Sequence, residues 1–163
     1  MNQSVYIAYW QSPLGLIEIK SKGDALISVH LCKESMDSAS LKVFTQPVVI
    51  SQCICELEAY FKGTLTHFTV KLAPEGTAFQ QKVWRALREI PYGETYTYAQ
   101  LAEKIGNPRA CRAVGGANHN NPLWIVVPCH RVIGANGSLT GYASGIKVKA
   151  WLLKHEKEHV EKD

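Results

Sequence analysis

The stretch from residue 121 to 134 constrains the fold most, because it joins an apolar run to a group of reactive side chains. Residues 123–127 are all apolar, and they are followed directly by Pro128-Cys129-His130-Arg131. A proline donates no backbone hydrogen bond, so the order predicts a core strand that ends at Pro128 and leaves the Cys129 thiol at its end. A free cysteine is only slightly ionised near neutral pH, and a basic neighbour makes it a better nucleophile. The alternative is a buried cysteine with a structural role.

The size and composition are those of an ordinary globular protein. The 163 residues, 46% apolar and 20% charged, suffice for one domain or two small ones. No apolar run approaches the roughly 18 residues that span a bilayer, and the first residues lack the features of a signal peptide. These observations predict a cytoplasmic protein without a membrane segment. The five cysteines show no disulfide or zinc spacing, so all are predicted to be reduced thiols.

The positive charge is concentrated in the second half of the chain. Residues 78–154 carry ten Lys and Arg against three Asp and Glu, whereas residues 1–77 carry six against seven. The basic segment also holds the candidate nucleophile, which favours an anionic partner such as a nucleic acid. A solvated basic surface without a partner remains the alternative.

The first half predicts an antiparallel meander and one helix. Residues 5–10, 14–20 and 25–31 are β-rich segments separated by turn signals. Ser51 is expected to cap a helix that runs through Phe61 and ends at Gly63. Residues 65–72 read as a further strand, and residues 73–76 as a linker.

The second half predicts a series of helices. Thr77 with Gln80 has the pattern of a capping box for a helix over 78–90. Thr97 is expected to cap a helix over 98–105 that ends at Gly106, and Asn107-Pro108 to begin a third helix over 109–117. The last two form a helix-turn-helix, and a final helix is expected over 145–158. Gly115 and Gly116 cost the third helix about 1 kcal/mol each, which indicates close packing by another helix or close approach by another molecule.

Three segments together resemble the DNA O6-alkylguanine alkyltransferases, or methylated-DNA–protein-cysteine methyltransferases. They are the Pro-Cys-His-Arg block, the segment 112–117 before it and the segment 151–156 after it. The resemblance implies an α+β fold with a small N-terminal ribonuclease-H-like α/β domain, residues 1–76. A C-terminal helical domain, residues 77–163, would carry a winged-helix-like helix-turn-helix. Some relatives hold zinc in the N-terminal domain, but residues 1–31 contain no cysteine, so neither a metal nor another cofactor is expected.

The resemblance implies that the chain transfers the alkyl group of O6-alkylguanine in DNA to Cys129, irreversibly and once per molecule. Whether O4-alkylthymine is also a substrate is left open by the sequence. His130 would take the thiol proton through a water molecule, and Glu156 would orient His130. Asn121 would brace the turn that carries the cysteine, and Tyr98 would protonate the departing guanine.

The implied partner is double-stranded DNA, bound by a monomer through the minor groove. Arg112 would fill the stack after the damaged nucleotide has rotated out, and Tyr98 would assist the rotation. The other residues expected to touch DNA are Asn107, Ala110, Cys111, Ala113 and Gly115.

The expected alkyl pocket is formed by Val127, Tyr142, Ala143, Ser144 and Trp151. Ala143 stands where animal members have serine, so a side-chain hydroxyl contact to the lesion is absent. Arg131 is expected to give structural support.

Three other functions fit parts of the sequence. A lesion-binding protein without transfer activity would carry tryptophan in place of Cys129. A thiol redox sensor or hydrolase would need neither Arg112 nor the glycine-bearing helix. A transcription activator switched by alkylation would have a long metal-binding N-terminal extension.

Overall fold

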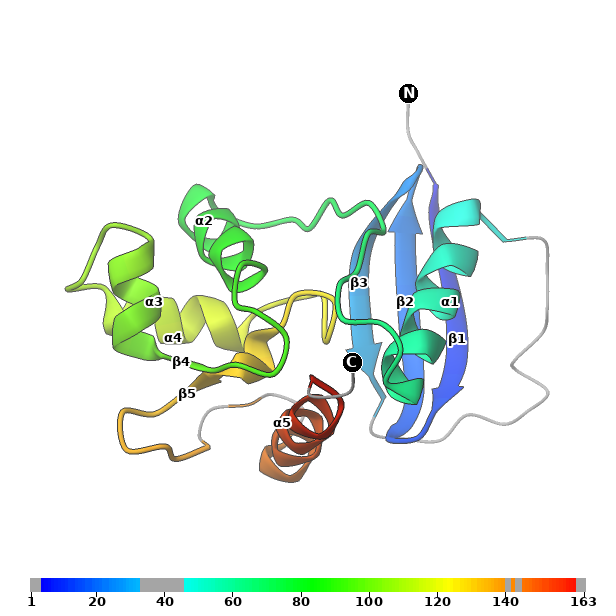
Figure 1. The fold of residues 1–163 in the computed structure, drawn as a ribbon. Coiled ribbons are helices and arrows are strands. Elements are labelled where there is room, and N and C mark those ends of the chain that lie inside the picture. The colour runs from blue at the N-terminus through cyan, green and yellow to red at the C-terminus, as the bar shows by residue number, and fades with distance from the viewer. Residues whose placement is uncertain (1–3, 33–45, 140–141, 143–144, 161–163) are drawn as a thin grey trace. The chain divides into compact units, whose positions relative to one another are not determined.

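The computed structural model describes residues 4–32, 46–139, 142 and 145–160 (Figure 1). The chain divides into two compact units, one formed by residues 1–75 with 122–126 and the other by residues 76–121 with 127–163. No helix among the described residues is long and apolar enough to cross a membrane. The mixture of an N-terminal sheet and C-terminal helices is the α+β class that the sequence predicts.

The first unit is a three-stranded antiparallel sheet covered on one face by a helix, as Figure 1 shows. The strands β1 (Val5–Ser12), β2 (Gly15–Lys22) and β3 (Ala25–Leu31) pair in sequence order, which confirms the meander. Ile17 and Ile19 of β2 are fully buried, because alternate side chains of a strand point to the same face. Ile50 and Leu57 of helix α1 (Val48–Lys62) are also fully buried.

Helix α1 begins earlier than the sequence predicts. Pro47 precedes its first residue, and the Pro47 carbonyl accepts hydrogen bonds from the N–H groups of Ile50 and Ser51. The expectation that Ser51 is the N-cap is therefore wrong. The expected end is confirmed, since Gly63 follows the helix with a φ of 81°, a conformation that glycine adopts without steric cost.

The expected strand over residues 65–72 is also wrong. Only Leu72 forms a bridge, to Leu26 of β3. The N–H groups of Thr69 and Val70 donate instead to the Glu56 carboxylate of α1, at 3.0 and 2.9 Å. A side chain thus takes the donors that a strand would have used.

The apolar run before the cysteine is a pair of turns and not a strand. It pairs with β3 at one place, where the Trp124 N–H donates to the Val29 carbonyl at 3.0 Å. The Val126 N–H then donates to the Trp124 carbonyl at 2.8 Å, around Ile125, whose φ is 68°. This is the rare form of γ-turn, and a positive φ in a β-branched residue costs about 1–3 kcal/mol.

The second unit consists of helices and one short two-stranded sheet. Its elements are α2 (Ala78–Leu87), β4 (Tyr96–Thr97), α3 (Tyr98–Lys104), α4 (Cys111–His119), the short 3-10 helix η2 (Cys129–Arg131), β5 (Val132–Ile133) and α5 (Ile146–Val160). Strands β4 and β5 are parallel, and α2, α3 and α4 pack against one another. Helices α3 and α4 form the predicted helix-turn-helix.

Two helix starts follow the sequence signals closely. The side chains of Thr77 and Thr97 each accept a hydrogen bond from the N–H three residues later, and the side chains of Gln80 and Gln100 each accept one from the threonine N–H. The capping box at Thr77 and the cap at Thr97 are thus confirmed. Helix α2 ends at Leu87, before the expected residue 90, because the Ile90 N–H bonds to the Leu87 carbonyl in a tighter turn.

The starts of α4 and α5 differ from the prediction. Asn107 does not cap α4, because its carbonyl accepts the Ala110 N–H in a separate turn, and the helix begins at Cys111. Helix α5 spans 146–160 instead of 145–158. Ile146, its first residue, is 55% exposed.

Candidate active site

Cys129 lies at the start of η2 and is held there by its backbone. Its N–H donates to the Val127 carbonyl at 2.8 Å around Pro128, whose φ and ψ are −81° and 66°, the values of an inverse γ-turn. Asn121 Nδ2 donates to the same Val127 carbonyl at 2.9 Å. Asn118 Nδ2, at the end of α4, donates to the Cys129 carbonyl at 3.3 Å. The cysteine is thus fixed by a turn, with no strand involved.

The Cys129 thiol is buried, with 6% of the residue exposed. Burial raises the pKa of the thiol, while the nearby Asn121 and Tyr142 side chains and the positive charge of Lys149 act in the opposite direction. Because burial has the larger effect, the resting group is the neutral thiol. Its proton needs an acceptor before the sulfur can act as a nucleophile.

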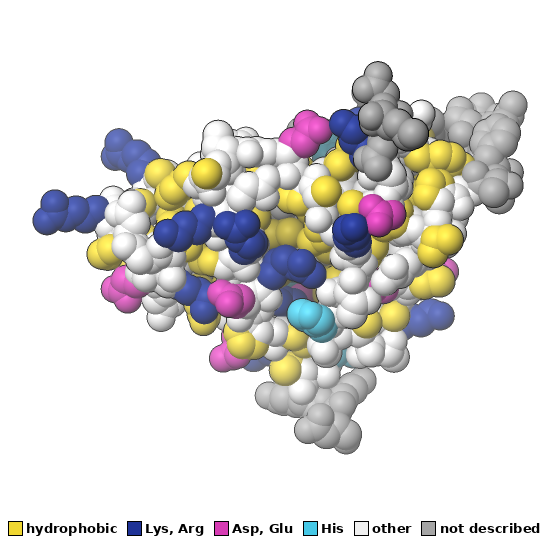
Figure 2. All heavy atoms as spheres, turned by 90° about the horizontal axis from the view of Figure 1, so that it is seen from above, with side chains coloured by type: hydrophobic (Ala, Val, Ile, Leu, Met, Phe, Trp, Pro, Cys, Tyr) yellow, Lys and Arg dark blue, Asp and Glu magenta, His cyan; other side chains and the backbone are white. Residues whose placement is uncertain are grey.

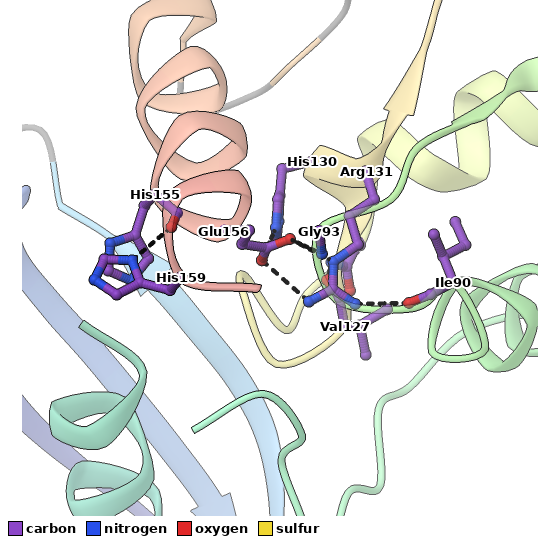
Figure 3. A network of polar contacts seen from close by, with 9 residues as sticks. Ile90, Gly93, Val127, His130, Arg131, His155, Glu156 and His159 are labelled. Carbon is purple, nitrogen blue, oxygen red and sulfur yellow. Dashed lines mark hydrogen bonds and ion pairs between the residues drawn. The ribbon is translucent and has the colours of Figure 1, made fainter. Parts of the chain in front are cut away.

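His130 and Glu156 form a buried pair beside the cysteine. The distance from His130 Nε2 to Glu156 Oε2 is 2.6 Å, and neither side chain is more than 1% exposed (Figure 3). Burial lowers the pKa of His130, Glu156 opposes this, and the charges of Arg131 and Lys149 reinforce it. The histidine is therefore neutral, with its Nε2 proton directed at the carboxylate. Its Nδ1 atom is buried and receives no hydrogen bond from the described residues.

Arg131 binds the other side of the same carboxylate. Its Nε and Nη2 atoms lie 2.8 and 3.0 Å from Glu156 Oε1 and Oε2. Burial alone would raise the pKa of Glu156, but the contacts with His130 and Arg131 together hold it well below its usual value. Glu156 is therefore a carboxylate over the whole neutral range.

Lys149 is a site residue that the sequence did not reveal. It lies on α5, is fully buried, and its Nζ atom is 5.7 Å from the centre of the Tyr142 ring. Burial lowers the pKa of Lys149, and the charge of an ionised Cys129 would raise it. A signal existed, since residues 149, 152 and 156 have helical spacing and thus share one face.

The residues expected to touch DNA lie on and before α4. Arg112 and Ala113 are exposed on this helix, Asn107 is exposed before it, and Ala110 and Cys111 are half-buried. A Cβ atom at Gly115 would lie 3.8 Å from the half-buried Tyr98 ring, and one at Gly116 would meet nothing within 4 Å. Close packing within the chain therefore does not require either glycine.

Exposed Lys and Arg side chains are frequent in the second unit, and Figure 2 shows many such side chains in dark blue. Those of the second unit are Lys82, Arg85, Lys104, Arg109, Arg112, Lys147, Lys154 and Lys157. They agree with the basic character of this half of the sequence.

The expected pocket residues are described in part. Val127 is buried, the Tyr142 side chain contacts the thiol of Cys129, and Trp151 stacks on His155 with ring centres 4.9 Å apart. Ala143 and Ser144 lie outside the described residues. Over the part of the chain that is described, no three His, Cys, Asp or Glu side chains are placed to hold a metal ion.

Two family models match the chain in succession. The ribonuclease-like domain of 6-O-methylguanine DNA methyltransferase matches residues 5–74, and the DNA-binding domain of the same family matches residues 78–158. The methylated-DNA–protein-cysteine methyltransferase of Methanosarcina acetivorans is 51% identical over 93% of this chain and 98% of its own length. The chain belongs to the methylated-DNA–protein-cysteine methyltransferase family.

Other members of the methylated-DNA–protein-cysteine methyltransferase family agree in fold as well as sequence. The relative from Mycobacterium tuberculosis is 45% identical over 93% of this chain and 92% of its own length. A crystal structure of the Mycobacterium tuberculosis O6-methylguanine methyltransferase covers 98% of this chain and 97% of its own, with a TM-score of 0.85 and 44% identity. A structure of Mycobacterium tuberculosis OGT in complex with DNA covers 94% and 93%, with a TM-score of 0.83 and 44% identity.

Proposed function

We propose that this protein repairs double-stranded DNA by transferring the alkyl group of O6-alkylguanine to the sulfur of Cys129. One observation carries the proposal: the buried imidazole of His130, next in sequence to Cys129, lies 2.6 Å from the Glu156 carboxylate. The thiol itself is influenced by Asn121, Tyr142 and Lys149. A nucleophile, a base and an acid that orients the base are the parts that such a transfer needs. Membership of the family supports the same reaction.

The hydrogen bond to Glu156 decides which nitrogen of His130 acts as the base. Because the carboxylate accepts the Nε2 proton, Nδ1 keeps its lone pair. The thiol proton passes to Nδ1 through one water molecule, and the sulfur attacks the alkyl carbon. A C–S bond forms, the bond between carbon and guanine O6 breaks, and Tyr98 supplies a proton to the departing guanine. The thioether is stable, so each molecule acts once.

In the proposed complex, helix α4 is the element that contacts DNA. Its exposed Arg112 fills the base stack while the damaged nucleotide is rotated out, at a cost of a few kcal/mol. The small residues around it, Ala110, Cys111, Ala113 and Gly115, allow the helix to approach the minor groove, with Asn107 at its edge. Because neither glycine of the helix is needed for packing within the chain, contact with another molecule is the better reason for them.

The pocket for the rotated base is formed by Val127, Tyr142 and Trp151, with Ala143 and Ser144 in the adjoining segment. We further propose that residues 1–76 are a structural domain and residues 77–163 the catalytic one. The protein would act as a cytoplasmic monomer, which light scattering and cell fractionation can test.

A transfer assay tests the function directly. After incubation with duplex DNA containing O6-methylguanine, mass spectrometry should find one methyl group on the peptide that contains Cys129. Cys129→Ala should accept none, while Cys55→Ser, which changes an exposed cysteine of α1, should react as the wild type does. Competition between methyl and benzyl lesions would show the range of substrates. If Cys129→Ala still accepted the methyl group, the proposed function would be wrong.

The salt dependence of binding tests the DNA contact. If several phosphates are neutralised, the logarithm of the affinity should fall with the logarithm of the salt concentration by about 0.9 per phosphate. Binding that does not change with salt would contradict the proposed docking.

A further inference from the structure

Arg131 makes three side-chain hydrogen bonds within the site, to Glu156 and to Ile90. Two of its nitrogens bind the two oxygens of Glu156, and its Nη1 atom donates to the Ile90 carbonyl at 2.7 Å. Ile90 lies just after α2, whereas Glu156 lies on α5 (Figure 3). The guanidinium group is planar and its donors form a rigid fork, so these three contacts fix its orientation.

The fork also fixes the carboxylate of Glu156. Its Oε2 atom accepts hydrogen bonds from both Arg131 Nη2 and His130 Nε2, while its Oε1 atom accepts one from Arg131 Nε. Rotation of the carboxylate would break two contacts with Arg131 at once, so Oε2 stays directed at the imidazole. The position of His130 as a base therefore depends on Arg131 through Glu156.

The charge of Arg131 has a second consequence. Glu156 is buried and ionised, and such a group needs a compensating positive charge. Arg131 supplies this charge and leaves the imidazole neutral. Without Arg131, His130 is the nearest group that can bind a proton and become the counter-ion of Glu156.

We propose that Arg131 is a positioning residue of the transfer reaction, which holds Glu156 in place and neutralises it so that His130 remains an unprotonated base. This inference rests on the proposed function, in which His130 takes the thiol proton. The chemistry agrees, because a histidine that already carries a proton at Nδ1 cannot accept one from Cys129.

The other ionisable groups near His130 do not replace Arg131. Lys149 on α5 opposes protonation of His130 through its charge, and its Nζ atom lies 5.7 Å from the centre of the Tyr142 ring. From the segment after α2, the Tyr92 ring lies 5.6 Å from the Arg131 guanidinium. Burial raises the pKa of Tyr92 to about 12, so this phenol is neutral near neutral pH.

The test measures the single-turnover rate of methyl transfer against pH for three variants. In Arg131→Met, the midpoint of the acid limb should move up by about one to three pH units, because a charge a few ångströms away is lost. One unit below the new midpoint the rate is about tenfold lower than its plateau. Arg131→Lys keeps the charge but not the fork, so it should be slower with little change in midpoint. Lys157→Met removes an exposed charge from α5, the helix that carries Glu156, and should behave as the wild type.

An NMR titration of the His130 imidazole gives a second measurement that does not depend on transfer. The ring should remain neutral to lower pH in the wild type and in Arg131→Lys than in Arg131→Met. A purely structural role would slow the reaction equally at every pH and leave the titration of His130 unchanged, and this result would overturn the inference. Faster transfer by Arg131→Met in acid would overturn it too.

If Arg131→Met does not fold, a shifted titration in Arg131→Lys refutes the role of charge. Absence of transfer in the wild type would instead refute the proposed function.

Discussion

Replacement of Glu156 by glutamine should destabilise the second unit strongly. The carboxylate is fully buried and holds His130 and Arg131 by contacts of 2.6, 2.8 and 3.0 Å. Glutamine has nearly the same shape, so no cavity forms. It carries no charge, however, and leaves the guanidinium of Arg131 buried without its counter-ion.

The size of the effect follows from the burial of the pair. Removing one partner of a buried ion pair costs about 3–5 kcal/mol. For a chain of this length each kcal/mol lowers the melting temperature by about 2–4 °C, so a decrease of roughly 6–20 °C is expected. The control is Glu158→Gln on the same helix, whose partner Lys154 is 3.9 Å away and whose side chain is 58% exposed. An exposed pair contributes at most about 1 kcal/mol.

Urea denaturation followed by circular dichroism, with thermal melting, measures both variants against the wild type. The pH dependence adds a check on the cause. The pKa of Glu156 is lowered in the folded protein, so its contribution is complete above its ordinary value of 4.5 and is lost as the pH falls through the folded value. The difference between the wild type and Glu156→Gln should therefore shrink in acid. If the two variants lost equal stability near neutral pH, the account of the buried network would be wrong.

Three further changes test other contacts of the second unit. Lys149→Met removes the buried charge beside the thiol and should slow methyl transfer about tenfold in a single-turnover assay. Lys147→Met changes an exposed position and should leave that rate unchanged. Gly116→Ala should stabilise α4 by about 0.5–1 kcal/mol, measured by urea denaturation, because the new Cβ meets nothing in the chain; it should also weaken DNA binding in a fluorescence titration. Trp84→Phe removes the 2.8 Å hydrogen bond from Nε1 to the Ala117 carbonyl and should cost about 1–3 kcal/mol in the same denaturation assay.

Signals that act within a few residues predicted the helix starts well. Thr77 and Thr97 cap their helices because the N–H group that each one binds lies three residues away, and the chain brings it there without help from elsewhere. Ser51 failed as a cap because Pro47 offered an earlier start. A proline just before a helix is as strong a local signal as a serine, and the sequence alone did not rank the two.

Predictions that depended on distant partners failed more often. Residues 65–72 have strand composition, but Glu56 takes the donors of Thr69 and Val70, and no pattern within that segment reveals a carboxylate on another helix. Lysine is seldom fully buried, so the residue type argued against a buried position for Lys149, although its helical spacing with Leu152 and Glu156 argued for one. The local order Pro128-Cys129-His130 pointed to the thiol and its basic neighbour, but Glu156 was named only through the family resemblance, since residues 130 and 156 are too far apart in sequence for spacing to relate them.

Glu156, which binds His130, lies on α5 and therefore comes after Cys129 in the chain. A nascent chain on the ribosome therefore carries Cys129 before it carries Glu156, and the imidazole between them is without its partner until α5 has been made and has docked. The second unit is thus completed in the same step that gives the His130 imidazole its carboxylate partner. Under the proposed function, a partly synthesised molecule would therefore lack the pair that activates Cys129 and would not use its one transfer early.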